Sequence, residues 1–136
     1  MSAVAVRLRN VIAMEDIDVA LKQAMMIEGA LGAALVDVNS GMALGAMGGG
    51  SDFDLGVAAA GNTDVVRAKL RVMEMLNLSG RIEDILTTLT SQYHLIRPLT
   101  SNSGQGLFLY LVLDRNRANL ALARRQLNQV EAGLDL

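Results

Sequence analysis

VDVNSGMALG, residues 36 to 45, has the pattern of two apolar strands joined by a three-residue polar turn. Asn39-Ser40-Gly41 fits a hairpin loop in which Gly41 takes a positive φ. Asp37 ends the first strand, where an aspartate commonly accepts hydrogen bonds from turn amides. The stretch therefore predicts a hairpin corner. The alternative, a polar site around Asp37 that performs chemistry, needs further residues from elsewhere in the chain.

The segments on either side of this turn extend the hairpin. Residues 31 to 38, LGAALVDV, are nearly all apolar and are bounded by glycine and turn residues, which predicts a buried strand. Residues 42 to 47, MALGAM, predict the returning strand. The following GGGSD, residues 48 to 52, predicts a flexible break.

A short amphipathic helix is expected before these strands. Asp16 stands where an N-cap belongs, and Gly29 is a natural C-terminal stop. Between them apolar residues recur at helical spacing, at Ile17, Leu21, Ala24 and Met25. Residues 1–15 give no firm pattern and are treated as an N-terminal extension, either disordered or the start of the first helix. Residues 16–136 form a single expected domain.

The longest helical pattern covers about residues 54 to 77 and carries more apolar surface than one sheet face needs. At about 100° per residue, its charged residues gather on one face. The apolar residues spread over roughly 200° of the helix, where a stripe a little over about 100° wide would suffice. They are Val65, Val66, Ala68, Leu70, Val72, Met73 and Leu76.

Three strands and a helix complete the expected order. Residues 82–90 are rich in β-branched side chains, residues 93–100 follow closely enough to return as a hairpin, and LFLYLVLD at 107–114 is apolar on both faces. The last pattern predicts a central strand. Pro98 cannot donate to a ladder, so it should lie near the end of its strand. A final helix over about 115–132 has a narrow apolar seam at Leu120, Ala123, Leu127, Val130 and Leu134.

The composition excludes several function classes. The chain has 136 residues, no cysteine, one histidine and a formal net charge of -2 with scattered basic residues. Thiolate metal sites, cysteine nucleophiles and sites with two imidazoles are therefore excluded, and no basic patch indicates nucleic acid or anionic lipid. No segment resembles a signal peptide or a membrane span, so a cytoplasmic location is expected. With 51% hydrophobic and 19% charged residues, self-association is favoured.

The candidate chemical residues do not form a catalytic group by their spacing. His94 lies beside Tyr93 in a strand without a metal-ligand partner and is expected to be structural. Ser103 lies in the predicted turn SNSGQG, not in a nucleophile elbow, so hydrolysis by Ser103 and His94 is the weakest alternative. The glycines of GGGSD lack the residues of a phosphate-binding loop. No catalytic, cofactor or metal site is predicted.

Asn62 and Lys69 lie seven residues apart within the apolar arc of the long helix. Lys69 could extend past its neighbours into water. The sharper hypothesis is that Asn62 and Lys69, which lie nearly on one line along the helix, face a second subunit. A polar residue in such an interface fixes the register of the two helices.

The ordered pattern over residues 16 to 132 resembles the roadblock/dynein light-chain domain family. The resemblance lies in the strand GALGAALVD, the turn NSG, the strand MALGAM, the alanine-rich long helix and LFLYLVLD. It implies a profilin-like α-β-β-α-β-β-β-α fold of the α+β class. A five-stranded antiparallel sheet would carry the long helix on one face and the two terminal helices on the other. The loop GGGSDFD and the N-terminal extension depart from the family pattern.

The resemblance also implies a homodimer in which edge strands and long helices meet. Here these would be the strand from Ile82 to Thr90 and the long helix. The interface residues expected on this basis are Asn62, Val65, Val66, Lys69, Leu70, Met73, Ile85, Thr87 and Leu89.

The resemblance implies a bacterial, non-enzymatic adaptor that binds a Ras-like small GTPase or scaffolds a signalling or motility complex. It implies no cofactor, no catalytic residue and no nucleic-acid partner. The alternative function is a small-ligand sensor with a cavity between sheet and helix, lined by methionines such as Met25 and Met73.

Overall fold

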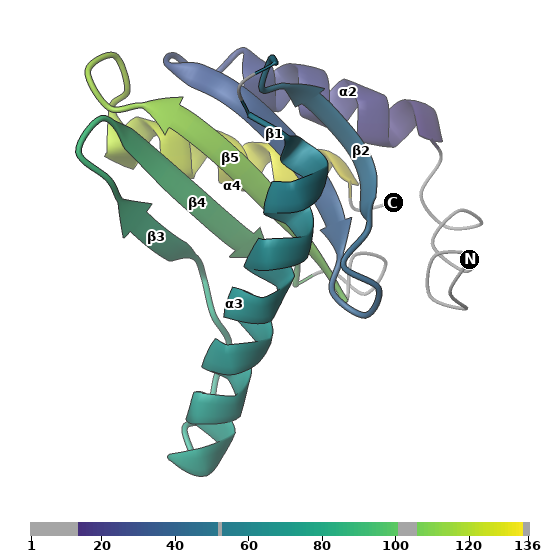
Figure 1. Cartoon of the computed structure of the whole chain (residues 1–136), viewed down its shortest axis with the longest axis vertical. Coiled ribbons are helices and arrows are strands. Elements are labelled where there is room, and N and C mark those ends of the chain that lie inside the picture. Colours follow the sequence, from purple (N-terminus) through teal and green to yellow (C-terminus); the bar gives the residue numbers. More distant parts are fainter. Residues whose placement is uncertain (1–13, 52, 101–105, 135–136) are drawn as a thin grey trace.

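The computed structural model of the protein describes residues 14–51, 53–100 and 106–134. Its elements follow the expected order of helices and strands (Figure 1). They are α2 (Met14–Met25), β1 (Ala30–Asp37), β2 (Ala43–Gly48), α3 (Leu55–Met75), β3 (Ile85–Thr88), β4 (Gln92–Pro98), β5 (Leu107–Asp114) and α4 (Leu120–Leu134). Among these elements, no helix combines the length and apolarity needed to cross a bilayer.

The five strands form one antiparallel sheet with the order β2-β1-β5-β4-β3. The central strand is β5, as its apolar pattern predicts. Its residues alternate between two clusters, with Leu109 and Leu111 in one and Phe108 and Tyr110 in the other. Pro98 is the last residue of β4, where its missing N–H costs no interior ladder bond. The expected sheet is thus confirmed.

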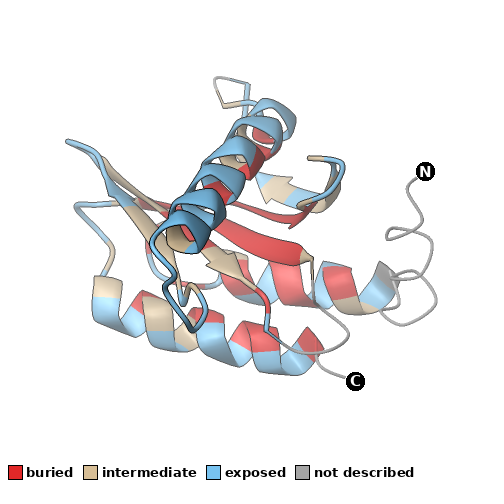
Figure 2. Ribbon diagram, turned by 90° about the horizontal axis from the view of Figure 1, so that it is seen from below, coloured by how far each residue is buried: buried red, intermediate tan, exposed pale blue. Residues whose placement is uncertain are grey.

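The helices cover the two faces of the sheet unequally. One cluster joins buried residues of α2 and α4 to the sheet, including Leu21 and Leu127. The other joins the opposite face to α3, which is the only described helix in that cluster, through Leu55, Ala59 and Val66. Figure 2 shows α3 on one side of the sheet and the two terminal helices on the other. This is the layered α+β arrangement that the resemblance to roadblock domains implies.

The VDVNSGMALG stretch forms the predicted hairpin corner between β1 and β2. Asp37 is fully buried, and its carboxylate accepts hydrogen bonds from the Asn39 amide (3.2 Å) and the Ser40 hydroxyl (2.8 Å). Gly41 has a φ of 74° and its amide donates to the Asp37 carbonyl at 2.8 Å. Arg67 on α3 donates to the Val38 and Asn39 carbonyls at 2.7 and 2.6 Å. The turn and Asp37 therefore serve the fold.

The boundaries of both terminal helices differ from the predicted ones. α2 already includes Met14, so Asp16 lies within its first turn and not before the helix. α4 begins at Leu120, whereas the sequence predicts a start near 115. The side chains of Asp114 and Asn119 explain this delay. Asp114 accepts from the Asn116 amide at 3.0 Å and holds a turn, and Asn119 accepts from the Leu122 amide at 3.1 Å as an N-cap does.

The strand predicted over 82–90 is much shorter in the structure, because β3 spans only Ile85–Thr88. Before it, Asp84 is bound by the Arg124 guanidinium of α4 at 2.8 and 3.1 Å. After it, the Leu89 amide donates to the Gln92 carbonyl at 2.8 Å and starts the turn into β4. Both ends of β3 are therefore fixed by other contacts.

A substitution at Gly48 tests the backbone conformation at the end of the edge strand β2. It ends β2 at a φ of 78°, and a Cβ there would lie 2.5 Å from the Leu31 carbonyl oxygen. We expect Gly48→Ala to lower the free energy of unfolding by about 2 kcal/mol or more, through left-handed strain and the clash. Chemical denaturation measures this change.

The matched control is Gly61→Ala on α3, where an added Cβ meets no atom within 4 Å. Alanine should raise stability there by about 0.5–1 kcal/mol, because glycine is the poorer helix former. Equal effects of the two substitutions would contradict the assigned end of β2.

Candidate interaction surface

The first half of α3 packs on the sheet through one stripe of residues. Leu55, Ala59, Thr63 and Val66 are its buried positions and step by four, four and three residues. This spacing keeps them on one face of the helix. Asp54 caps the helix by accepting from the Gly56 and Val57 amides at 2.9 and 3.1 Å. These bonds use the amides that a phosphate bound after the GGGSD loop would need.

The second half of α3 continues the same stripe beyond the sheet. Leu70 and Met73 follow Val66 by steps of four and three, so they lie on the sheet-facing side of the helix. Figure 1 shows that this part of α3 extends past the strands. The exposed fraction rises from 1% at Val66 to 46% at Leu70. An apolar stripe therefore leaves the core and is not buried by any described residue of the chain.

Further apolar side chains widen this surface. Val65, Val72 and Leu76 are exposed, with Leu76 at 63%. At about 100° per residue they share one side of the helix next to the stripe, and Lys69 lies among them. The charged residues Asp64, Arg67, Arg71 and Glu74 occupy the opposite side. We call the exposed residues Val65, Lys69, Leu70, Val72 and Leu76, together with the half-buried Met73, the α3 surface.

β3 is an edge strand and contacts only β4 within the described sheet. Thr87 and Leu89 are exposed near its free side, whereas Ile85 is partly buried against the hydrophobic cluster that joins α3 to the sheet. An edge strand presents unpaired N–H and C=O groups that another strand can join. The chain returns directly from the end of α3 to this edge (Figure 1).

The structure separates the expected interface residues into two groups. The first group, Val66 and Asn62, packs within the chain. Val66 is buried against the sheet and is not available to a partner. Asn62 is half-buried and forms a hydrogen bond to Tyr110. Residues of the second group are exposed or half-buried beside the uncovered stripe or the β3 edge. They are Val65, Lys69, Leu70, Met73, Ile85, Thr87 and Leu89.

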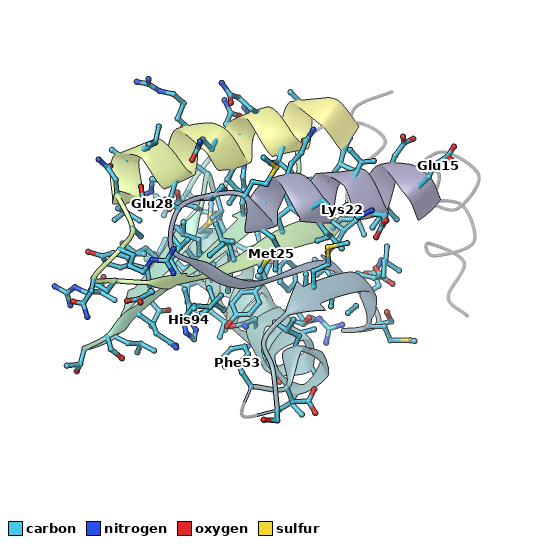
Figure 3. The ribbon with its side chains drawn as sticks, turned by 90° about the horizontal axis from the view of Figure 1, so that it is seen from above. Glu15, Lys22, Met25, Glu28, Phe53 and His94 are labelled. Carbon is cyan, nitrogen blue, oxygen red and sulfur yellow. The ribbon has the colours of Figure 1, made fainter. Side chains whose placement is uncertain are left out.

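His94 joins a polar network between the sheet and the start of α3. Its Nδ1 lies 2.9 Å from the Tyr110 hydroxyl, and its Nε2 lies 2.8 Å from Gln92 Oε1. Phe53 stacks edge-on to the ring at 5.9 Å between centroids, and Figure 3 shows both side chains on the α3 side of the sheet. Burial lowers the pKa of His94. Burial also raises the pKa of Tyr110, and the hydrogen bond from Asn62 lowers that pKa by a smaller amount.

The structure describes only part of the alternative sites that the sequence raised. Ser103 lies outside the described residues, so the serine–histidine alternative has no described geometry. The described residues contain no group of His, Cys, Asp or Glu able to hold a metal ion. Met25 packs between α2 and the sheet (Figure 3), whereas Met73 lies on α3, which covers the opposite face. One cavity between sheet and helix therefore cannot be lined by both methionines.

Two buried or half-buried ion pairs were missed by the sequence reasoning. Arg97 donates to Glu131 at 2.7 Å, and Arg124 donates to Asp84 at 2.8 Å. Burial acts to raise the pKa of Glu131, but hydrogen bonds from Thr100 and Arg97 hold that pKa below its usual value. The partners lie 34 and 40 residues apart, and no spacing rule along one element relates residues so distant.

No family model and no curated protein sequence matches the chain. Solved structures do match it. MglB of Myxococcus xanthus has a TM-score of 0.74 at 17% identity, covering 90% of this chain and 86% of that one. The gliding protein MglB of Thermus thermophilus has a TM-score of 0.73 at 17% identity, covering 89% and 87%.

A roadblock domain of Streptomyces avermitilis has a TM-score of 0.69 at 13% identity, covering 87% of this chain and 90% of that chain. An MglB structure in a tetrameric arrangement has a TM-score of 0.73 at 17% identity, covering 89% and 86%. These similarities extend over nearly the whole chain and confirm its fold.

The lowered pKa of His94 predicts that stability decreases in mild acid. The unfolded chain takes up the imidazole proton near pH 6.5, and the folded chain does so only at lower pH. With respect to His94, the free energy of unfolding should be constant between about pH 7 and pH 9 and fall as the pH drops below about 6.5. Urea denaturation at several pH values measures this fall.

His94→Gln is the control, because His94 is the chain's only histidine. The variant should lose the pH dependence between about pH 6.5 and pH 5, above the range in which carboxylates titrate. An unchanged slope in the variant would show that another group causes the effect.

Proposed function

We propose that this chain, which has the roadblock fold, is a bacterial adaptor or regulator without catalytic activity of its own. It acts as a homodimer or higher oligomer in the cytoplasm and binds a Ras-like small GTPase. The observation that carries the proposal is the uncovered continuation of the α3 stripe, from Val66 to Leu70 and Met73. This surface suits a protein partner better than a small molecule.

A second copy of the chain is the occupant that we propose for the α3 surface. Apolar area buried between two copies contributes about 25 cal/mol per Å², and a two-fold dimer places the same patch on both sides. Two α3 helices lying side by side would cover each other's Leu70 and Leu76. Lys69 lies within the same surface and, as a polar residue at the seam, would favour one register.

The β3 edge extends the same interface. Pairing of two β3 strands would satisfy their free backbone groups and join two sheets into one. Ile85, Thr87 and Leu89 would lie along this junction, and Asn62 would stay at the margin through its bond to Tyr110. Val66 is left out because its own sheet covers it. The tetrameric arrangement of one similar MglB structure supports self-association.

The proposal of a GTPase partner rests on the resemblance to roadblock domains. The similarity to gliding proteins supports a role as a regulator or scaffold. A protein of this kind would position the residues of its partner, since GTP hydrolysis depends mainly on positioning and charge stabilisation.

Leu70→Asp tests the proposed self-association. Light scattering at micromolar concentration should give twice 14.5 kDa, or a multiple, for the unaltered chain. Leu70→Asp should give 14.5 kDa, because a carboxylate would have to lose its hydration in the interface. Circular dichroism should be unchanged, since Leu70 lies beyond the sheet.

Val57→Asp is the matched control on the same helix. Val57 is 69% exposed in the first turn, where an acidic residue also suits the helix dipole. This variant should keep the mass of the unaltered protein. A monomeric unaltered chain, or a folded Leu70→Asp variant of unchanged mass, would overturn the proposed interface.

The partner is tested with purified Ras-like GTPases from the organism that encodes this chain. Each is loaded with GDP or with a non-hydrolysable GTP analogue and mixed with the protein. We expect one of them to co-elute in size-exclusion chromatography and to do so more strongly in one nucleotide state. A Ras-like GTPase of an unrelated organism is the control. Absence of a complex with every GTPase in both states would reject this partner class.

A further inference from the structure

An open cleft of about 400 Å³ lies on the α4 side of the sheet, away from the α3 surface. It forms where the approach to β3, the end of β4 and α4 meet. We call it the arginine cleft. Its lining residues are Arg81, Glu83, Asp84, Arg97, Pro98, Thr100, Arg124, Arg125 and Asn128.

The walls of the arginine cleft are fixed by internal ion pairs. The Arg124 guanidinium binds both Asp84 oxygens, at 2.8 and 3.1 Å. Arg97 donates to Glu131 and to Asn128, each at 2.7 Å. The other oxygen of Glu131 accepts from the Thr100 amide at 2.8 Å and from its hydroxyl at 3.1 Å. The charges of Asp84 and Glu131 are thus neutralised within the chain.

Two arginines of the cleft are left for a partner. Arg81 and Arg125 are exposed, and neither has an ion-pair partner among the residues that the structure describes. Glu83 is the opposing charge at the rim. Two guanidinium groups against one carboxylate leave the mouth of the cleft positive, although the whole chain has a net charge of -2.

The chemistry of the lining indicates the kind of ligand. Binding pockets for small organic molecules are enclosed and mostly apolar, whereas this cleft is open and lined mainly by polar groups. Guanidinium groups bind carboxylates through paired hydrogen bonds. We propose that the arginine cleft binds an acidic segment of a partner protein through Arg81 and Arg125. Because the cleft and the α3 surface lie on opposite faces, one molecule could use both together.

The test uses a fluorescently labelled hexaglutamate peptide and the unaltered 136-residue chain, with fluorescence anisotropy as the readout. The peptide should bind saturably, more weakly as salt increases, and hexaglutamine should not bind. Arg81→Glu and Arg125→Glu should each weaken binding about fivefold or more. Both side chains are exposed and have no ion-pair partner among the described residues, so the variants should fold like the unaltered protein.

Arg117→Glu is the matched control, because it changes the net charge equally at an exposed arginine outside the cleft. It should leave binding unchanged. An equal loss in all three variants, or no loss in either cleft variant, would overturn the proposal. Saturable binding of inorganic phosphate without binding of hexaglutamate would replace it with a phosphate site.

Leu70→Asp distinguishes this proposal from the proposed self-association. Hexaglutamate binding should be the same for this variant and for the unaltered chain, because the cleft is complete within one molecule. The two proposals can therefore fail independently.

Discussion

The burial of β5 on both faces is the constraint on which the rest of the structure depends. Leu109 and Leu111 point to one cluster and Phe108 and Tyr110 to the other, and all four are at most 1% exposed. A strand of this kind needs a neighbour on each side and a layer of helices above and below. β1 and β4 supply the pairing. The helices α2, α3 and α4 then divide the two faces between them.

The division of helices is unequal, and the exposed surface of the molecule follows from it. α2 and α4 together close one face. Among the described helices only α3 covers the other, and its buried contacts with the sheet end at Val66. Beyond that point no described residue of the chain buries its apolar stripe. A sheet with one long helix on one face thus leaves apolar helix surface exposed among the described residues as a direct result of its architecture.

Polar contacts hold these layers in place at their edges. Arg67 ties α3 to the β1–β2 turn, Arg97 ties β4 to Glu131 of α4, and Arg124 ties α4 to Asp84 before β3. Two of these contacts, those of Arg97 and Arg124, are ion pairs. An ion pair contributes little to stability when it is fully exposed. Here the two carboxylates are largely buried and Glu131 accepts additional hydrogen bonds, so the pairs fix where the elements meet. The same contacts shape the arginine cleft, whose outer guanidinium groups have no ion-pair partner among the described residues.

The sequence by itself determined the element order, the hairpin corner at Gly41 and the central position of β5. Each depends on a local pattern of apolar, glycine and polar residues. The α3 stripe shows the limit of such patterns, because Val66 and Leu70 have the same periodicity, yet one is buried and the other exposed. Only the tertiary structure decided this difference, since it depends on where the sheet ends beneath the helix. The partners of Arg97 and Arg124, and the hydrogen bond between Tyr110 and His94, were likewise decided by folding, because the residues of each pair come from different elements.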